Sequence, residues 1–132
     1  MATTSSPERV LMEGYLLKKG NIVRQWRKRF LRLSYRFDAG HVVEYLAAPL
    51  DPTVKGTVHL GRNAACEPTQ SSSKQFVFTV RTGAGREYDF AAEDESSRDA
   101  WMVAIKTAIF DAVIHSESIG SVERSWRPRA ST

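Results

Sequence analysis

Hydrophobic and polar residues alternate along most of this chain, in short runs that turn residues separate. Alternation with a period of two is typical of β-strands that bury one face. The clearest run places Phe76, Phe78 and Val80 on one side, and a Gly-Ala-Gly tripeptide follows it as a turn signal. The pattern predicts seven strands, over Gly14–Lys19, Arg24–Tyr35, His41–Ala47, Lys55–Leu60, Arg62–Glu67, Gln75–Arg81 and Arg86–Ala91.

After position 94 the pattern changes to a repeat of three to four residues, which is typical of an amphipathic helix. Asp94 or Ser96 can cap its start. We expect the helix to run from about Glu95 to about His115, with Gly120 ending any continuation. Its apolar stripe consists of Trp101, Ile105, Ala108, Ala112 and Ile109.

Seven strands followed by one helix predict a mainly β fold with a single C-terminal α-helix. A small antiparallel sheet must cover one apolar face and its edges. Curling into a barrel or an orthogonal sandwich does both, and the helix can then cover one open end. We expect residues 1–8 to form a disordered lead and residues 117–132 a flexible C-terminal tail.

Composition fits one ordinary domain, because 132 residues with 42% hydrophobic residues can bury a single core. No apolar run approaches the roughly 18–20 residues of a membrane-spanning helix, and residues 1–7 lack a signal-peptide pattern. One cysteine, Cys66, excludes an internal disulfide and favours a reducing compartment. We therefore expect a cytoplasmic protein in which Cys66 is a small, partly buried side chain.

Positive charge is concentrated in one segment. Eight of the 19 Lys and Arg residues lie between Lys18 and Arg36, a stretch without any acidic residue. The rest of the chain carries the other 11 bases and all 15 acids, so it is net negative although the whole chain is +4. Such a dipolar molecule should attract multiply charged anions to one local patch.

The basic residues lie on two predicted strands that a short loop connects. On each strand the apolar residues are farther from the loop and the cations are nearer to it. Such a hairpin sends its apolar side chains to the core and brings Lys18 and Arg29 together at one open end. The alternative is a solvated basic strand with no specific ligand. The shared faces are Leu16 with Lys18, and Arg27 with Arg29, Leu31 and Leu33.

The loop between the two basic strands has an apolar tip. Ile22 and Val23 lie between Lys19 and Arg24. An apolar tip flanked by bases suits insertion into an anionic membrane, with the bases at the headgroups. In the alternative interpretation these two side chains fold back onto the sheet.

Three segments resemble the pleckstrin homology (PH) domain family. They are Glu-Gly-Tyr-Leu-Leu-Lys-Lys-Gly at 13–20, Trp-Arg-Lys-Arg-Phe-Leu-Arg-Leu at 26–33, and the helix segment around Trp101. The resemblance covers about residues 9–116 and implies a PH domain of that extent. It implies seven antiparallel strands in two nearly orthogonal sheets, capped by the helix, and a non-catalytic module.

Many members of that family bind phosphoinositides through a lysine, a variable loop and a Lys/Arg-x-Arg pattern. Lys18, Arg27 and Arg29 match this pattern, and we expect neighbouring bases of the loop to assist. The resemblance also implies a base before the fourth strand and a tyrosine on the third. The expected ligand-binding set is therefore Lys18, Arg27, Arg29, Lys55, Arg24, Lys19 and Tyr45, with Ile22 and Val23 for membrane insertion.

These patterns favour a monomeric phosphoinositide-binding module that recruits its protein to the cytoplasmic membrane surface. An alternative is a PH-fold adaptor for an acidic protein partner, with weak or no lipid binding. Nucleic-acid binding is disfavoured because no aromatic stacking pair marks an open sheet face. His41, His59 and His115 have no metal-ligand spacing, and no catalytic set or cofactor motif is present.

Overall fold

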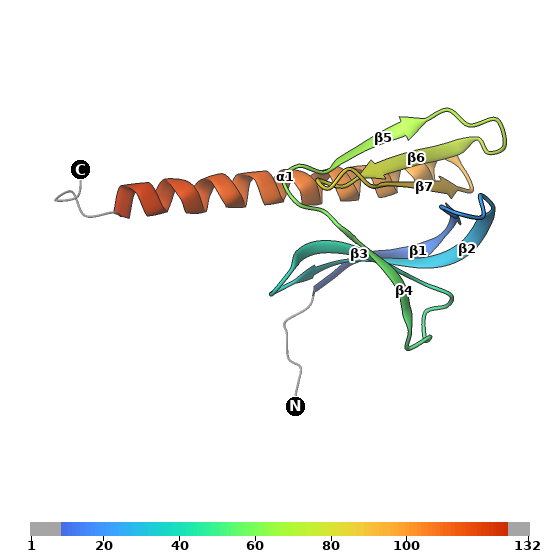
Figure 1. The fold of residues 1–132 in the computed structure, drawn as a ribbon, viewed down its shortest axis with the longest axis horizontal. Coiled ribbons are helices and arrows are strands. Elements are labelled where there is room, and N and C mark those ends of the chain that lie inside the picture. The colour runs from blue at the N-terminus through green and yellow to red at the C-terminus, as the bar shows by residue number, and fades with distance from the viewer. Residues whose placement is uncertain (1–8, 127–132) are drawn as a thin grey trace.

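The structure is a computed structural model that describes residues 9–126, with side chains described up to His115. Its strands and its helix follow one another in the predicted order (Figure 1). The elements are β1 (Arg9–Lys19), β2 (Trp26–Arg36), β3 (Gly40–Leu46), β4 (Val54–His59), β5 (Ala65–Thr69), β6 (Phe76–Arg81), β7 (Glu87–Ala92) and α1 (Glu95–Trp126).

The strands pair antiparallel in the order β4-β3-β2-β1-β7-β6-β5. Two halves, β1–β4 and β5–β7, meet where β1 pairs with β7, through Leu17 opposite Ala91 and Lys18 opposite Phe90. Within residues 9–126, β4 and β5 are the two ends of the sheet and are not paired with each other. The fold is therefore the predicted sandwich, and the alternative of a closed barrel is wrong.

All seven predicted strands are present, but their boundaries differ from those expected. β1 begins at Arg9, five residues before Gly14, because its first half pairs with the end of β2 across a bulge. β2 begins at Trp26, so Arg24 lies in the loop. The fifth strand begins at Ala65 instead of Arg62, because pairing with β6 fixes its position.

The helix begins at Glu95 as predicted, and the backbone amide of Ser97 donates to Asp94 Oδ1 at 2.7 Å as an N-terminal cap. It continues through Gly120 to Trp126, so the expected end at His115 is wrong. One glycine costs only about 1 kcal/mol relative to alanine, which does not end a long helix. Of the expected lead and tail, residues 1–8 and 127–132 lie outside the described residues.

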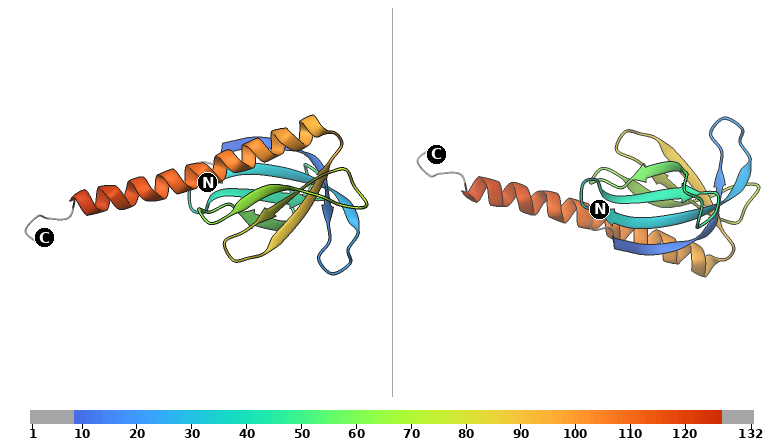
Figure 2. Two further views of the ribbon diagram at one scale, coloured as in Figure 1. Left: turned by 90° about the horizontal axis from the view of Figure 1, so that it is seen from above. Right: turned by 90° about the horizontal axis from the view of Figure 1, so that it is seen from below.

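The core lies between the two halves of the sheet. Leu31 and Leu33 of β2 are fully buried, as their alternation predicted. The helix adds Trp101 and Ile105, which are 2% and 0% exposed and close one end of the sandwich. Figure 2 shows the helix along that end, while the β1–β2 loop and the β6–β7 turn extend at the other, called here the open end.

Candidate functional site

A buried lysine lies at the open end. The side chain of Lys18 shares the inner face of β1 with Leu16, and only 9% of the residue is exposed. Its ammonium nitrogen lies 4.7 Å from the centre of the Tyr45 ring and 5.7 Å from that of Tyr88, and donates to the Lys19 carbonyl at 3.4 Å. A cation–π arrangement of this kind holds the charge in place on an aromatic floor formed by the two tyrosines.

Two arginines lie near this lysine. The guanidinium of Arg86 is 4.9 Å from the centre of the Tyr88 ring. Burial lowers the pKa of Lys18, the positive charges of Arg86 and Arg29 lower it further, and Asp89 opposes them. Arg29 and Arg86 therefore each repel Lys18, and a shared anion would stabilise these three residues, which we call the cation cluster.

Arg86 was not in the predicted ligand-binding set, and the turn before it explains its position. The amide of Gly85 donates to the Thr82 carbonyl and that of Thr82 to the Arg86 carbonyl, each at 2.9 Å. Gly85 has a φ of 92°, which favours glycine. A base directly after the Gly-Ala-Gly turn was the available signal, but its approach to Lys18 depends on the pairing of β7 with β1.

Tyr45 of β3 is buried beside the cation cluster, next to Gly56 of β4. A Cβ atom at position 56 would overlap the Tyr45 hydroxyl, so glycine makes room for this ring. Burial raises the pKa of Tyr45 above its ordinary value, and the nearby Tyr88 raises it further. The hydroxyl therefore stays protonated at neutral pH and is available to donate a hydrogen bond.

Arg27 and Lys55 lie apart from this cluster. Arg27 is paired directly opposite Lys18, but its exposed guanidinium donates to Gln25 Oε1 at 3.3 Å. Lys55 is exposed at the start of β4, adjacent to Gly56. Of the expected ligand-binding set, the structure brings together Lys18, Arg29 and Tyr45, and leaves on the periphery Arg27, Lys55, Lys19 and Arg24.

Lys19 and Arg24 line a small hollow of about 80 Å³ together with two acids, Glu87 and Asp89. Asp89 also accepts a hydrogen bond from Thr79 Oγ1 at 2.6 Å. Because carboxylates already face these two bases, the hollow itself is a poor phosphate site. The two bases suit long-range attraction better than direct coordination.

The apolar tip of the β1–β2 loop is open to solvent. Ile22 is 95% exposed and Val23 is 56% exposed, so these side chains do not fold back onto the sheet. The loop itself is ordered by backbone hydrogen bonds from Gly20 to Gln25 (3.0 Å) and from Gln25 to Val23 (2.8 Å). A side chain at Gly20 would overlap the Val23 carbonyl.

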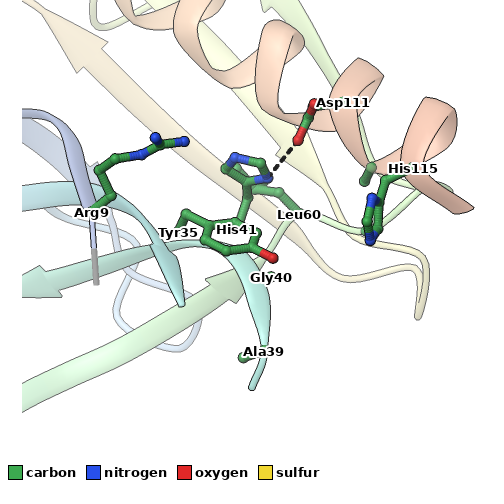
Figure 3. Close-up of a pocket in the computed structure, with 10 residues that line it drawn as sticks. Arg9, Tyr35, Ala39, Gly40, His41, Leu60, Asp111 and His115 are labelled. Atoms are coloured by element: carbon green, nitrogen blue, oxygen red, sulfur yellow. Dashed lines mark ion pairs between the residues drawn. The ribbon is translucent and has the colours of Figure 1, made fainter. Parts of the chain in front are cut away.

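A larger hollow of about 330 Å³ lies between the helix and the strands near the start of β3 (Figure 3). Figure 3 shows His41 between Arg9 and Asp111. The Nδ1 of His41 lies 3.9 Å from Asp111 Oδ2. The charged groups here have both signs. Among the described residues no group of three or more His, Cys, Asp or Glu side chains is placed to hold a metal ion.

Cys66 is buried in the core, where burial raises the pKa of its thiol to about 11. A thiol with so high a pKa is protonated at neutral pH and is a poor nucleophile. Val80 lies opposite it on β6, so Cys66 has a packing role in the core.

Comparison with known proteins places this geometry in a family. A family model described as PH domain matches residues 10–110. The chain belongs to the PH domain family. Such domains commonly bind phosphoinositides or mediate interactions, and are generally non-catalytic. No helix within the described residues is both long and apolar enough to cross a membrane.

Human pleckstrin is 33% identical over 104 residues, covering 78% of this chain and 28% of pleckstrin. This PH domain protein thus spans less than a third of that relative. Among solved structures, the C-terminal PH domain of pleckstrin in complex with D-myo-Ins(1,2,3,5,6)P5 superposes with a TM-score of 0.67 at 24% identity, covering 76% of this chain and 96% of that one. The same domain with D-myo-Ins(1,2,3,4,5)P5 gives 0.61 at 25% identity, covering 76% and 98%.

Proposed function

We propose that this PH domain binds phosphoinositide headgroups at the cation cluster and so recruits its protein to a cytoplasmic membrane surface. The observation that carries the proposal is the convergence of Lys18, Arg29 and Arg86 at one open end. These residues come from β1, β2 and the turn before β7. The aromatic floor of Tyr45 and Tyr88 lies beneath two of them.

Phosphates on neighbouring carbons of an inositol ring need several donors within a small volume. Arginine offers a planar fork with two parallel N–H donors, and lysine offers a compact charge. A hydrogen bond to a charged group contributes about 1.5–3 kcal/mol. Three or four such bonds, less the cost of ordering, give a binding free energy of about −8 kcal/mol, which corresponds to micromolar affinity.

The complexes of the pleckstrin C-terminal PH domain support this choice of ligand. In both complexes the bound molecule is an inositol phosphate, and in the second the aligned domain is 25% identical to this chain. The cation cluster supplies the charge that such a ligand requires, independently of that likeness.

The exposed bases around the cluster would act on the membrane at longer range. Each base near an anionic surface adds about 1 kcal/mol of attraction. Arg27, Lys55, Lys19 and Arg24 have this role in our proposal. Ile22 and Val23 would enter the bilayer between the headgroups, because both apolar side chains are more than half exposed to solvent.

An adaptor role is the second candidate, and one observation favours it. Val103, Phe110 and Ile114 of α1 are 63%, 64% and 48% exposed, and their spacing places them on one side of the helix. Exposed apolar side chains aligned in this way suit contact with another protein. This side is distinct from the open end, so lipid binding and partner binding would be separable by mutation.

Vesicle co-sedimentation tests the primary function. The chain is mixed with phosphatidylcholine–phosphatidylserine vesicles that carry one phosphoinositide at a time, at two salt concentrations. Lys18→Ala combined with Arg29→Ala should abolish binding while leaving the folded structure intact. The control, Arg9→Ala with Lys106→Ala, removes the same charge away from the cluster and should retain most binding.

Equal binding by the two double variants would show that a diffuse field is sufficient and would overturn the assignment to the cluster. Strong salt dependence together with a preference among phosphoinositides would support a defined pocket. A wild-type chain that binds no vesicle but captures a protein through α1 would favour the adaptor.

A further inference from the structure

The β3–β4 loop carries a continuous apolar run that the proposed function does not use. Ala47, Ala48, Pro49 and Leu50 are all exposed, and Leu50 is 94% exposed. Runs of exposed apolar residues are avoided in folded domains unless they have a binding role.

The backbone of this loop is fixed without help from the leucine side chain. The amide of Asp51 donates to the Ala48 carbonyl at 3.1 Å, which makes Pro49 and Leu50 the central residues of a tight turn. The amide of Thr53 donates to Asp51 Oδ1 at 2.9 Å and holds the return of the chain. Leu50 is therefore presented at the tip of an ordered turn with no contact that stabilises the fold.

The position of this turn connects it to the cation cluster. β1 and β3 run in the same direction, since each is antiparallel to β2, so the β1–β2 and β3–β4 loops leave the sheet on the same side. Both lie on the side of the sandwich away from the projecting end of α1 (Figure 1). Tyr45, whose ring lies beside the Lys18 ammonium group, is near the end of β3 just before the loop, and Lys55 is near the start of β4 just after it.

We propose that the β3–β4 turn is a second membrane-inserting element, which enters an anionic bilayer through Leu50, in addition to Ile22 of the β1–β2 loop. This inference rests on the proposed function and deepens it. The chain would contact the bilayer at two apolar tips, with the basic residues at the level of the phosphates.

The bases of the two loops favour a bilayer as the partner of these tips. An anionic membrane offers phosphates and an apolar layer a few ångströms deeper. Lys19 and Arg24 flank the exposed Ile22, and Lys55 follows the turn that exposes Leu50, while the acid beside Leu50, Asp51, already accepts the Thr53 amide. A soluble headgroup has no apolar part, so Leu50 should add nothing to its binding. Burial of a leucine side chain corresponds to about a tenfold to hundredfold gain in affinity, and that gain should appear with vesicles only.

The first test compares Leu50→Ser with Phe37→Ser. Phe37 is 73% exposed in the β2–β3 turn, at the other end of β2, and is the matched control. Leu50→Ser should weaken binding to phosphatidylcholine–phosphatidylserine vesicles carrying a phosphoinositide by about tenfold or more. It should leave titration with soluble inositol hexakisphosphate unchanged, and Phe37→Ser should change neither.

The second test reads insertion directly. In a Cys66→Ala background, Leu50→Cys and, separately, Phe37→Cys carry an environment-sensitive nitrobenzoxadiazole dye. On vesicle binding the dye at position 50 should shift its emission to the blue and be quenched by spin-labelled lipid. The dye at position 37 should not change.

The outcomes separate the two proposals. Vesicle binding with an unchanged dye at position 50 would overturn the insertion of Leu50 and leave headgroup binding intact. Absence of vesicle binding by the wild-type chain would overturn the proposed function, and this inference with it. If Leu50→Ser bound vesicles normally but lost a protein partner, the turn would be a protein contact and the bilayer assignment would be wrong.

Discussion

The ammonium nitrogen of Lys18 lies 4.7 Å from the centre of the Tyr45 ring, so side chains from β1 and β3 contact each other at the open end. Arg29 of β2 affects the pKa of both of them. Because the strand between them contributes as well, displacement of any one side chain should alter the whole cluster. The first two predictions test this dependence.

Gly56→Ala should damage the site through Tyr45. The added methyl group would overlap the Tyr45 hydroxyl and force the ring away from Lys18. We expect a loss of about 1–3 kcal/mol in the free energy of unfolding, together with weaker vesicle binding. Urea denaturation and co-sedimentation measure the two effects. Gly61→Ala is the control, since a Cβ there meets nothing within 4 Å; equal effects at both glycines would contradict the role of Tyr45.

Arg86→Ala should weaken binding to phosphoinositide vesicles about tenfold to hundredfold, because one charge-assisted fork is lost. Arg86→Lys keeps the charge but loses the fork, and it should lie between the wild type and Arg86→Ala. Arg32→Ala removes a base that is paired to Glu13 at 2.8 Å on another face and serves as the control. Wild-type affinity in Arg86→Ala would exclude this residue from the cluster.

The stability of the domain should decrease as the pH falls below about 6.5. Burial lowers the pKa of His41 and Arg9 lowers it further, while Asp111 partly opposes both. The unfolded chain takes up a proton near pH 6.5, where the folded chain does not, so unfolding becomes easier between that pH and the lower native pKa. Denaturation at a series of pH values should show this slope in the wild type and a flatter one in His41→Gln. Parallel slopes would refute the assignment to His41.

Ser34→Ala should leave the domain as stable as the wild type, or more stable by up to about 1 kcal/mol. Ser34 is 1% exposed, and its hydroxyl has no hydrogen-bond partner among the described residues. Removing an unpaired buried hydroxyl relieves a desolvation cost. Thr79→Val makes the opposite comparison, because Thr79 Oγ1 donates a hydrogen bond to Asp89 at 2.6 Å. This variant should lose about 1–3 kcal/mol in the free energy of unfolding. Thermal unfolding of both variants measures the difference.

Local patterns were sufficient to predict most of the fold. Alternation correctly placed Leu31 and Leu33 in the core, although it did not predict that Phe30 and Ser34 on the other face are buried as well. The change of period located the start of the helix at Glu95. The helix end was mispredicted because one glycine, Gly120, is a weak stop signal. Whether the sheet closes into a barrel was not predictable. Closure depends on whether β4 and β5 pair, and no local pattern encodes contacts between distant strands.

The candidate site was predictable to the extent that one hairpin forms it. Lys18 and Arg29 lie on neighbouring strands, so strand alternation placed them together. Arg86 reaches the same place only through the pairing of β7 with β1, which connects positions about 70 residues apart. Leu50 was passed over because a proline-containing turn predicts a loop but gives no information on its exposure.

The seam between β1 and β7 has a further consequence for the motions of the domain. Lys18 belongs to one half of the sheet, and Arg86 directly precedes β7, the strand of the other half that pairs with β1. Leu17 and Lys18 pair with Ala91 and Phe90 across this junction. A polyanion held by both cations would act as a clamp over this junction. Occupancy should therefore slow amide hydrogen exchange along the seam, so that binding would be detectable as local rigidity in the absence of any change of shape.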